Sequence, residues 1–262
     1  MIFQDQLNRP IEIESTPKRI ISLVPSITEL LCDLGLEDRI VGCTKFCVHP
    51  QHLRKRISII GGTKTIHLDR VQQLRPDLII ANKEENTKSD IEHLANEYPV
   101  WISDVQTRSE SLELIRQLGE LCGCSGSANR IINQLEKSHL AIPKLATKKV
   151  AYLIWKSPYM TIGADTFIHS MLEAHGFVNV FAERQRYPEV TLEEISRRKP
   201  ELIFLSSEPF PFKEDHLREI QEILGDSKVL LVDGEYFSWY GSRQLHLPEY
   251  IIRLNHKIES FN

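Results

Sequence analysis

Hydrophobic and polar positions follow two different periods along the 262 residues of the chain. Short apolar runs bounded by polar or turn residues are typical of strands buried inside a parallel sheet. Between these runs, apolar residues recur at steps of three and four, which is the spacing of an amphipathic helix. Strands that alternate with helices predict an α/β fold with mostly parallel sheets flanked by helices. The runs expected to form strands are 19–24, 40–42, 77–81, 100–103, 150–155, 201–205 and 229–232.

Several local signals predict where elements begin and end. Residues 3–13 predict a β-hairpin with Asn8 in its left-handed turn position. A capping box, in which a Ser or Thr and a Glu three residues later bond each other's backbone amide, is expected to start three helices. These boxes are Ser26 with Glu29, Thr107 with Glu110, and Thr191 with Glu194; Asp165 is expected to cap a further helix.

A gapless internal repeat divides the chain. The segment LDRVQQLRPDLIIA (68–81) superposes on LEEISRRKPELIFL (192–205), and the two agree in type at four apolar positions (68, 71, 78 and 79 of the first copy), at the proline and at three charged positions. Two copies of one helix–strand plan indicate two lobes of similar construction.

Between the two copies, the segment SGSANRIINQLEKSHLAIPKLA places small or apolar residues at helical spacing, from Ala128 through Leu135 to Ile142. Pro143 is expected to end or kink this helix. We therefore predict an N-terminal α/β lobe over residues 1–124, a single backbone linker helix over 125–146 and a C-terminal α/β lobe over 147–262.

Composition and charge exclude several classes of protein. The net charge is −4, with no basic or acidic block, which argues against a nucleic-acid partner. No apolar run approaches the ~18 residues needed to span a membrane. The first 15 residues carry neither a basic nor an apolar leader segment, so the chain as written is expected to be cytoplasmic.

The cysteines do not suggest a disulfide framework, because there are five in a chain of this length. Cys43, Cys47 and His49 form a candidate set of three metal ligands, but no second Cys or His pair completes it. Carboxylates at 84–85, 233 and 235, with His49 or His67, form a second candidate set with oxygen and nitrogen ligands. Acidic pairs at loop tips are more often solvated, and direct metal-ion binding stays an alternative.

Candidate chemistry belongs at the carboxyl ends of the strands, where ligands bind in α/β folds. The chain contains no nucleophile elbow, phosphate-binding loop, GxGxxG or HExxH motif, so the sequence does not support catalysis. Trp239 and Tyr240 lie in a polar loop flanked by Gly234 and Gly241. Aromatic faces in such a loop suit a broad planar or hydrophobic ligand.

Three segments resemble the helical-backbone substrate-binding proteins of ABC importers, and other short segments resemble the branch termed helical-backbone metal receptors. The three segments are RIISLVPSITELLCDLGLEDRIVG (19–42), GGTKTIHLDRVQQLRPDLIIA (61–81) and GADTFIHSMLEAHGFVNVF (163–181); the shorter ones are ANKEENTK, RYPEV, SSEPFPF and DGEYFSWYGSR. Proteins of this family carry cobalamin, haem or ferric siderophores. The resemblance implies two α/β lobes joined by one long helix, with the ligand held in the cleft between the lobes.

The resemblance also implies site residues. It places Pro25 and Phe46 on the wall of the amino lobe, with Phe46 where cobalamin-binding members have a tyrosine and Thr63 where they have a tryptophan. We expect tryptophan and tyrosine rings to stack on the ligand, lysine and arginine to meet its anionic periphery, and acidic residues to meet its polar groups. The full expected set is Pro25, Ser26, Lys45, Phe46, Lys64, Glu84, Glu85, Asn86, Trp155, Tyr159, Tyr187, Glu235, Trp239, Tyr240 and Arg243.

Family members dock on a membrane permease through an acidic residue on each lobe. Glu208 or Glu214 is the candidate on the carboxyl lobe, and we choose Glu208; on the amino lobe the matching position is Lys88. The expected function is non-enzymatic capture of a metal-bearing chelate by a monomer without intrinsic cofactor. A cobalamin-like corrinoid is the first choice, with haem or a ferric siderophore next. Family members are typically periplasmic proteins or lipoproteins. The alternative is a cytoplasmic enzyme or sensor of cobalamin or metal metabolism on the same scaffold.

Overall fold

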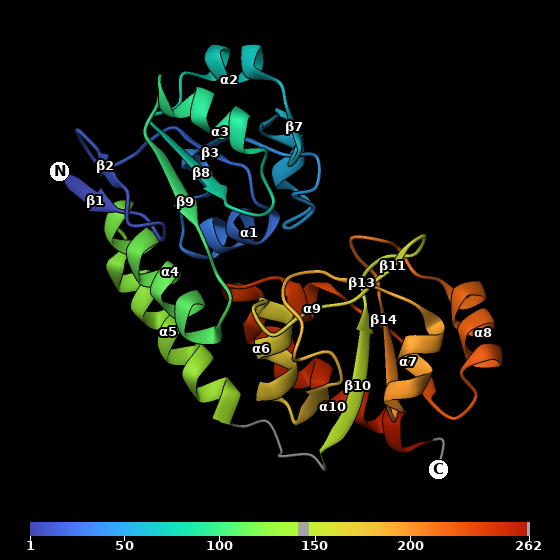
Figure 1. Ribbon diagram of the computed structural model, residues 1–262. Coiled ribbons are helices and arrows are strands. Elements are labelled where there is room, and N and C mark those ends of the chain that lie inside the picture. Colours follow the sequence, from blue (N-terminus) through green and yellow to red (C-terminus); the bar gives the residue numbers. More distant parts are fainter. Residues whose placement is uncertain (141–146, 261–262) are drawn as a thin grey trace. The chain divides into compact units, whose positions relative to one another are not determined.

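The computed structural model describes residues 1–140 and 147–260 and divides into two compact units (Figure 1). Unit 1 comprises Met1–Val105, Ser109–Lys137 and Tyr240–Arg243. Unit 2 comprises the described residues of Gln106–Arg108, Ser138–Trp239 and Gln244–Asn262. Each unit has its own mostly parallel sheet with helices, so the predicted α/β fold with two lobes is confirmed.

The sheet of unit 1 has five parallel strands in the order β5-β4-β3-β8-β9. Two antiparallel pairs accompany it, β1 with β2 and β6 with β7. The strands are β1 Ile2–Gln4, β2 Pro10–Glu12, β3 Ile20–Ser22, β4 Ile40–Cys43, β5 Ser58–Ile59, β6 Gly61–Gly62, β7 Thr65–Ile66, β8 Leu78–Asn82 and β9 Val100–Ser103. The helices are α1 Pro25–Asp33, η1 Glu37–Arg39, η2 Leu53–Lys55, α2 Leu68–Leu74, α3 Lys88–Ala95, α4 Arg108–Leu121 and α5 Ser125–Leu140.

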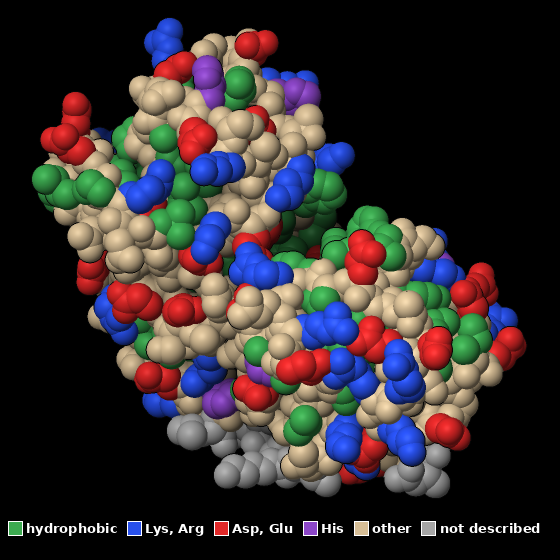
Figure 2. Space-filling view, in the orientation of Figure 1, with side chains coloured by type: hydrophobic (Ala, Val, Ile, Leu, Met, Phe, Trp, Pro, Cys, Tyr) green, Lys and Arg blue, Asp and Glu red, His purple; other side chains and the backbone are tan. Residues whose placement is uncertain are grey.

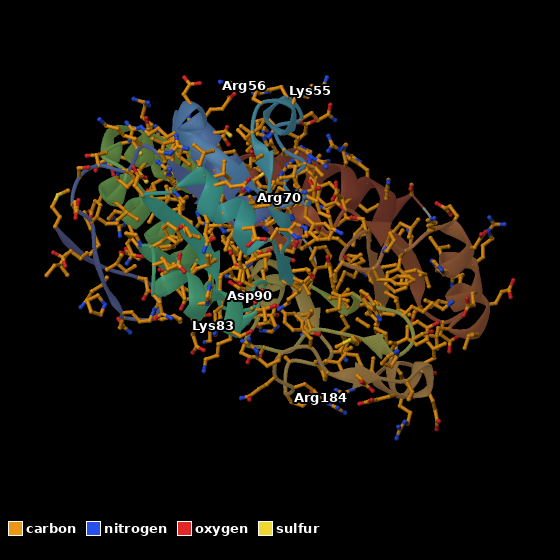
Figure 3. All side chains as sticks on the ribbon, turned by 90° about the horizontal axis from the view of Figure 1, so that it is seen from above. Lys55, Arg56, Arg70, Lys83, Asp90 and Arg184 are labelled. Atoms are coloured by element: carbon orange, nitrogen blue, oxygen red, sulfur yellow. The ribbon has the colours of Figure 1, made fainter. Side chains whose placement is uncertain are left out.

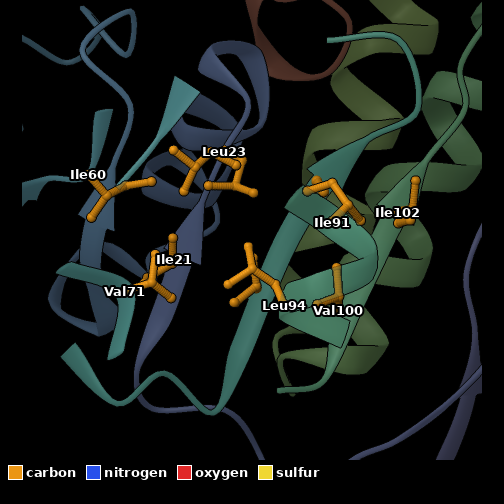
Figure 4. Packing of buried hydrophobic residues seen from close by; sticks show 11 residues of the cluster. Ile21, Leu23, Ile60, Val71, Ile91, Leu94, Val100 and Ile102 are labelled. Atoms are coloured by element: carbon orange, nitrogen blue, oxygen red, sulfur yellow. The ribbon is translucent and has the colours of Figure 1, made fainter. Parts of the chain in front are cut away.

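Continuous apolar runs form the core of unit 1, because the strands are covered on both faces. All five residues of β8 are buried. Ile79 of β8 and Ile21 of β3 pack with Val71 of α2, and Ile91 and Leu94 of α3 belong to the same cluster (Figure 4). These contacts fix where each parallel strand ends, and hence where its following loop begins.

Helix α5 agrees with the predicted backbone helix as far as it is described. Its apolar stripe is buried, with Ala128 facing α4 at Gly119. A side chain at Gly119 would bring its Cβ within 2.4 Å of the Ala128 Cβ, so the small residues let the two helices approach closely. The helix passes from unit 1 into unit 2 after Lys137. The remainder of the predicted helix, including Ile142 and Pro143, lies outside the described residues.

The sheet of unit 2 has four parallel strands in the order β12-β10-β14-β15. A small antiparallel pair, β11 with β13, accompanies it. The strands are β10 Lys148–Leu153, β11 Tyr159–Met160, β12 Phe177–Asn179, β13 Glu189–Val190, β14 Leu202–Ser206 and β15 Lys228–Val232. The helices are α6 Phe167–Ala174, α7 Leu192–Arg198, α8 Glu214–Ile223, α9 Glu235–Ser238, η3 Ser242–His246 and α10 Leu247–Glu259.

The internal repeat is confirmed as two copies of one structure, α2–β8 and α7–β14. Both helices end on a basic residue in the left-handed conformation, Arg75 at φ 45° and Lys199 at φ 49°. Pro76 and Pro200 follow, and a proline disfavours continuation of a helix. Each copy therefore turns from helix to strand in the same way.

The acidic residue after each proline ties the new strand to its neighbour. The carboxylate of Asp77 accepts hydrogen bonds from the backbone amides of Lys18 and Arg19, just before β3. The carboxylate of Glu201 accepts one from the amide of Lys149 on β10. The repeat thus reproduces a strand-aligning contact as well as a sequence pattern.

Of the predicted turn and helix caps, some are confirmed by the structure and others are wrong. The hairpin is confirmed by the antiparallel pair β1–β2 and by Asn8 at φ 61°. The capping box at Ser26 is wrong, because Pro25 already occupies the first helical position and Val24 is the N-cap. Asp165 is not a cap either: Thr166 caps α6, and Asp165 accepts from the amide of Arg186.

The box at Thr191 is half formed. The Thr191 hydroxyl accepts a hydrogen bond from the amide of Glu194, at 3.1 Å. The Glu194 carboxylate pairs with Arg184 and Arg198, and charge attraction explains that choice.

Across the described part of the chain, no helix is long and apolar enough to cross a membrane.

Candidate functional site

The carboxyl end of β4 presents an aromatic and a basic side chain in unit 1. Phe46 is 50% exposed, and the Lys45 ammonium lies 5.1 Å from the centre of its ring. A Cβ at Gly62 would contact both side chains, at 3.4 and 3.5 Å, so they lie over the β6–β7 hairpin. Lys64, in the same hairpin, is exposed and donates a hydrogen bond to the Glu84 carbonyl. The turn thus offers an apolar ring flanked by positive charge.

The neighbouring loop, after β8, is held by a buried polar network. The side-chain oxygen of Asn82 accepts from the backbone amides of Glu84 and Glu85, at 2.8 and 2.9 Å. The side-chain amide of Asn82 donates to the Ser103 hydroxyl and to the Tyr240 hydroxyl, both at 3.0 Å. Burial raises the pKa of Tyr240 well above its usual value, so this hydroxyl stays protonated.

Asn86 closes that loop from the other side. Its side-chain oxygen accepts from the backbone amide of Asn82 at 2.8 Å, and its side-chain amide donates to the backbone carbonyls of Leu23 and Thr63. Because these groups are buried, each lost partner would leave an unpaired polar atom. Asn86 therefore positions Glu84 and Glu85, which are half-buried. Lys83 points outward at the periphery of unit 1, where it pairs with Asp104 (Figure 3).

Three other predicted residues are also part of the interior of unit 1. Pro25 and Ser26 are buried in the first turn of α1. Arg243 is buried and forms a two-pronged ion pair with Glu29, at 2.8 and 2.9 Å. Paired, buried charges of this kind hold a segment in place, so Arg243 anchors the chain rather than offering a free cation.

Unit 2 presents an aromatic group at the end of β10. Trp155 is 39% exposed, and its ring lies edge-to-face with Phe210, 5.6 Å between centres. Phe210 in turn packs on Phe212, 4.8 Å away. Tyr159 is half-buried on β11, and its hydroxyl donates to Glu219, which also pairs with Lys156. Figure 2 shows hydrophobic side chains gathered at this end of unit 2.

Glu208 lies in the loop after β14 and is mostly buried. One carboxylate oxygen accepts from the Ser238 hydroxyl and from the Trp239 indole, the latter at 2.9 Å. Burial raises the pKa of Glu208 above its usual value. Its carboxylate thus holds the loop 233–239 in place, whereas Glu214, in the first turn of α8, is exposed.

The structure separates the predicted residues by exposure. Trp239 and Tyr240 are buried with their polar atoms engaged, so we treat them as supports of the site, together with Asn86, Arg243, Pro25 and Ser26. Those at least partly exposed are Lys45, Phe46, Lys64, Glu84, Glu85, Trp155, Tyr159, Tyr187 and Glu235.

Two contributors were missing from the predicted set. Ser103 bonds Tyr240 and Asn82, and Phe210 supports Trp155. Phe210 could have been found from its aromatic segment EPFPF, whereas nothing local marks Ser103.

Neither metal-ligand set considered from the sequence is assembled. Within residues 1–140 and 147–260, no group of three or more His, Cys, Asp or Glu side chains is arranged to hold a metal ion. Cys43 and Cys47 are buried free thiols.

Comparison with known proteins agrees with the two-unit fold. A family model described as periplasmic binding protein matches residues 20–229. The chain belongs to this family. An uncharacterised ABC transporter substrate-binding lipoprotein of Bacillus subtilis is 30% identical over 212 residues, which cover 76% of this chain and 67% of the relative. A vitamin B12-binding protein of Pectobacterium carotovorum is 25% identical over 240 residues, covering 87% and 85%.

The family member also resembles solved structures. The apo form of a periplasmic haem-binding protein from Roseiflexus superposes with a TM-score of 0.78 at 20% identity, covering 90% of this chain and 97% of that one. At this identity the likeness concerns the fold. With the sequence relatives, it confirms the predicted class: an ABC-importer type substrate-binding protein rather than an enzyme.

Proposed function

We propose that this protein captures a metal-bearing chelate for ABC-type uptake and hands it to a membrane permease. A cobalamin-like corrinoid is the first choice, with haem or a ferric siderophore next. Similarity to a vitamin B12-binding protein over 87% of the chain supports this order. The family assignment supports transport over the alternative of an enzyme or sensor.

One observation carries the proposal. Among the described residues, the exposed large hydrophobic side chains include two aromatic ones, Phe46 and Trp155. Each lies in the loop that follows a parallel strand, Phe46 after β4 in unit 1 and Trp155 after β10 in unit 2. Exposing an aromatic ring to water forgoes the free energy of burying it, and a flat apolar ligand would recover that free energy.

The charges around Phe46 indicate which chemical groups the ligand carries. Lys45 and Lys64 supply positive charge, while Glu84 and Glu85 supply carboxylates on the adjoining loop. A ligand with a hydrophobic face and a rim of carboxylate or amide groups fits such a surface. Corrinoids and haem both have this division between face and rim.

A ligand panel tests the proposal. The protein would be mixed with cyanocobalamin, haemin, a ferric hydroxamate and a ferric catecholate, and absorbance spectra and Tm recorded for each mixture. We expect saturable binding of one class, and a Tm that rises with ligand concentration because only the folded state binds. If no member of the panel shifts either the spectrum or Tm, the proposal fails.

Variants test the placement of the site. Phe46→Ala and Trp155→Ala should each weaken binding roughly five- to thirty-fold, corresponding to about 1–2 kcal/mol for an aromatic contact. Ile252→Ala is the matched control, because Ile252 is also an exposed apolar residue but lies on α10. Equal losses in all three variants would show that the aromatic residues have no special role.

A further inference from the structure

Two thiols meet beneath the Phe46 turn. Cys43 is the last residue of β4, and Cys47 follows four positions later. Thr44 contacts both sulfurs, that of Cys43 through its carbonyl and that of Cys47 through its hydroxyl; both cysteines are completely buried, and both are free thiols. The chain between them is a tight turn, in which the Cys47 amide donates to the Thr44 carbonyl at 3.1 Å.

Hydroxyl groups surround Cys47 in particular. Its sulfur lies 3.1 Å from the Thr28 hydroxyl and 3.3 Å from the Thr44 hydroxyl, while the Cys43 thiol donates to the Thr44 carbonyl at 3.4 Å. Burial acts to raise the pKa of Cys47, but the hydrogen bonds from Cys43, Thr28 and Thr44 outweigh it and lower that pKa to about 7. By contrast, burial raises the pKa of the Cys32 thiol to about 12, so Cys47 forms a thiolate more readily than Cys32 does.

We propose that Cys43 and Cys47 are a redox-active pair, and that oxidation joins them in a disulfide which clamps the turn 44–46. The pair lies within one unit, is separated by three residues, and has both sulfurs in contact with Thr44 between them. The exposed tip of the turn, Lys45 and Phe46, is where access would open. The oxidant class is a low-molecular-weight disulfide.

The reaction is an ordinary thiol–disulfide exchange. The Cys47 thiolate attacks one sulfur of the small disulfide, whose S–S bond breaks and releases one small thiolate. Cys43 then attacks the Cys47 sulfur of the mixed disulfide and releases the second small thiolate. The two protons lost by the cysteines end on the two released thiols, so the protein loses two electrons and the oxidant gains them.

The chemistry does not depend on the proposed function, but one consequence does. The disulfide closes a loop that contains Lys45 and Phe46, the residues proposed to contact the ligand. A clamped turn would hold Phe46 in fewer conformations, so the oxidation state of the pair would adjust ligand affinity. The formation of the bond is therefore tested separately from binding.

The position of Lys45 makes the disulfide directly visible. Trypsin cleaves after Arg39, Lys45 and Arg54, which puts Cys43 in peptide 40–45 and Cys47 in peptide 46–54. The folded protein would be incubated with glutathione disulfide, alkylated under denaturing conditions and digested. We expect the two peptides to appear as one linked species that dithiothreitol separates. Intact mass should fall by about 2 Da, and titratable thiols should fall from five to three.

Controls separate this pair from the other cysteines. Cys124→Ser, at a half-buried cysteine outside the pair, should leave the linked peptide unchanged. Cys43→Ser should abolish it and leave Cys47 glutathionylated or reduced. If Cys43→Ser does not fold, the wild-type peptide map still decides. The proposal would be overturned if oxidised wild type gave peptides 40–45 and 46–54 separately. It would also be overturned if either peptide were linked to Cys32, Cys122 or Cys124.

Discussion

The ends of strands β8 and β14 are equivalent positions of the repeat that have been filled in different ways. Asn82 ends β8, and Ser206 ends β14, 124 positions later, which is the spacing between Leu68 and Leu192. Each side chain binds its own following loop, Asn82 through the amide of Glu84 and Ser206 through the amide of Glu208. The scaffold and the loop contact are therefore shared.

The surroundings of the two strand ends differ. In unit 1 the partners are neutral: a Tyr240 hydroxyl, a Ser103 hydroxyl and the Asn86 amide. In unit 2 the Ser206 hydroxyl likewise meets a buried tyrosine hydroxyl, that of Tyr152 at 3.2 Å, but the following loop also folds a carboxylate inward: Glu208 accepts from Ser238 and Trp239. The repeat thus specifies where a loop starts, whereas the residues that cover the loop specify whether it is held by neutral groups or by charge.

The largest effect is expected from a substitution that removes the hydrogen bonds of Asn82. Asn82→Ala removes partners from the buried Tyr240 and Ser103 hydroxyls and from two loop amides, and should lower the free energy of unfolding by about 3 kcal/mol. The equivalent change, Ser206→Ala, removes partners from the buried Tyr152 hydroxyl and from one loop amide, and should cost about 2 kcal/mol. Urea unfolding of both variants beside wild type measures the difference. Equal losses would show that the two strand ends are held with the same strength.

The second prediction concerns the stability of unit 2 at acidic pH. His175 is buried, and its pKa is lowered to about 4, first by burial and then by nearby His139 and Arg108. No described residue forms a hydrogen bond with either ring nitrogen. Because the unfolded chain binds this proton more tightly, stability falls as pH drops below 6.5 and continues to fall towards 4.

The expected loss from this one group is about 2 kcal/mol between pH 7.5 and pH 5. His175→Leu should flatten that part of the stability curve, as measured by urea unfolding at each pH. His93→Leu, on exposed helix α3 of unit 1, is the matched control and should leave the curve unchanged. A His175→Leu curve parallel to wild type would contradict the assignment.

The smallest effect tests the charged half of the comparison. Burial raises the folded-state pKa of Glu208, so the folded protein holds its proton more tightly than the unfolded chain does. Glu208 therefore weakens the fold progressively as pH rises above its ordinary value of 4.5. Glu208→Gln keeps an acceptor for Ser238 and Trp239 and removes the charge, so it should gain stability relative to wild type as pH rises. Unfolding midpoints at pH 4 and pH 7.5 check the sign.

Elements with a strong period could be predicted from the sequence, as the two copies α2–β8 and α7–β14 show. Strand β12 was missed because it has only three residues, and helix α8 because few apolar residues mark its otherwise polar sequence. Whether an aromatic candidate is buried or exposed depends on contacts distant in sequence, which no local pattern contains. Tyr240 meets Asn82 across 158 positions, and this contact, rather than the polar loop around it, decides that the ring is buried.

The segment Tyr240–Arg243 belongs to unit 1 although Ser138–Trp239 of unit 2 separates it from the rest of that unit. A ribosome makes the first 137 residues long before it makes this segment, so during synthesis Glu29, Asn82 and Ser111 wait for their partners while nearly all of unit 2 emerges. Unit 1 therefore stays incomplete while most of unit 2 is being made. A nascent chain released before residue 243 would carry an unfinished amino-terminal unit, and the cell's proteases would meet it in that state.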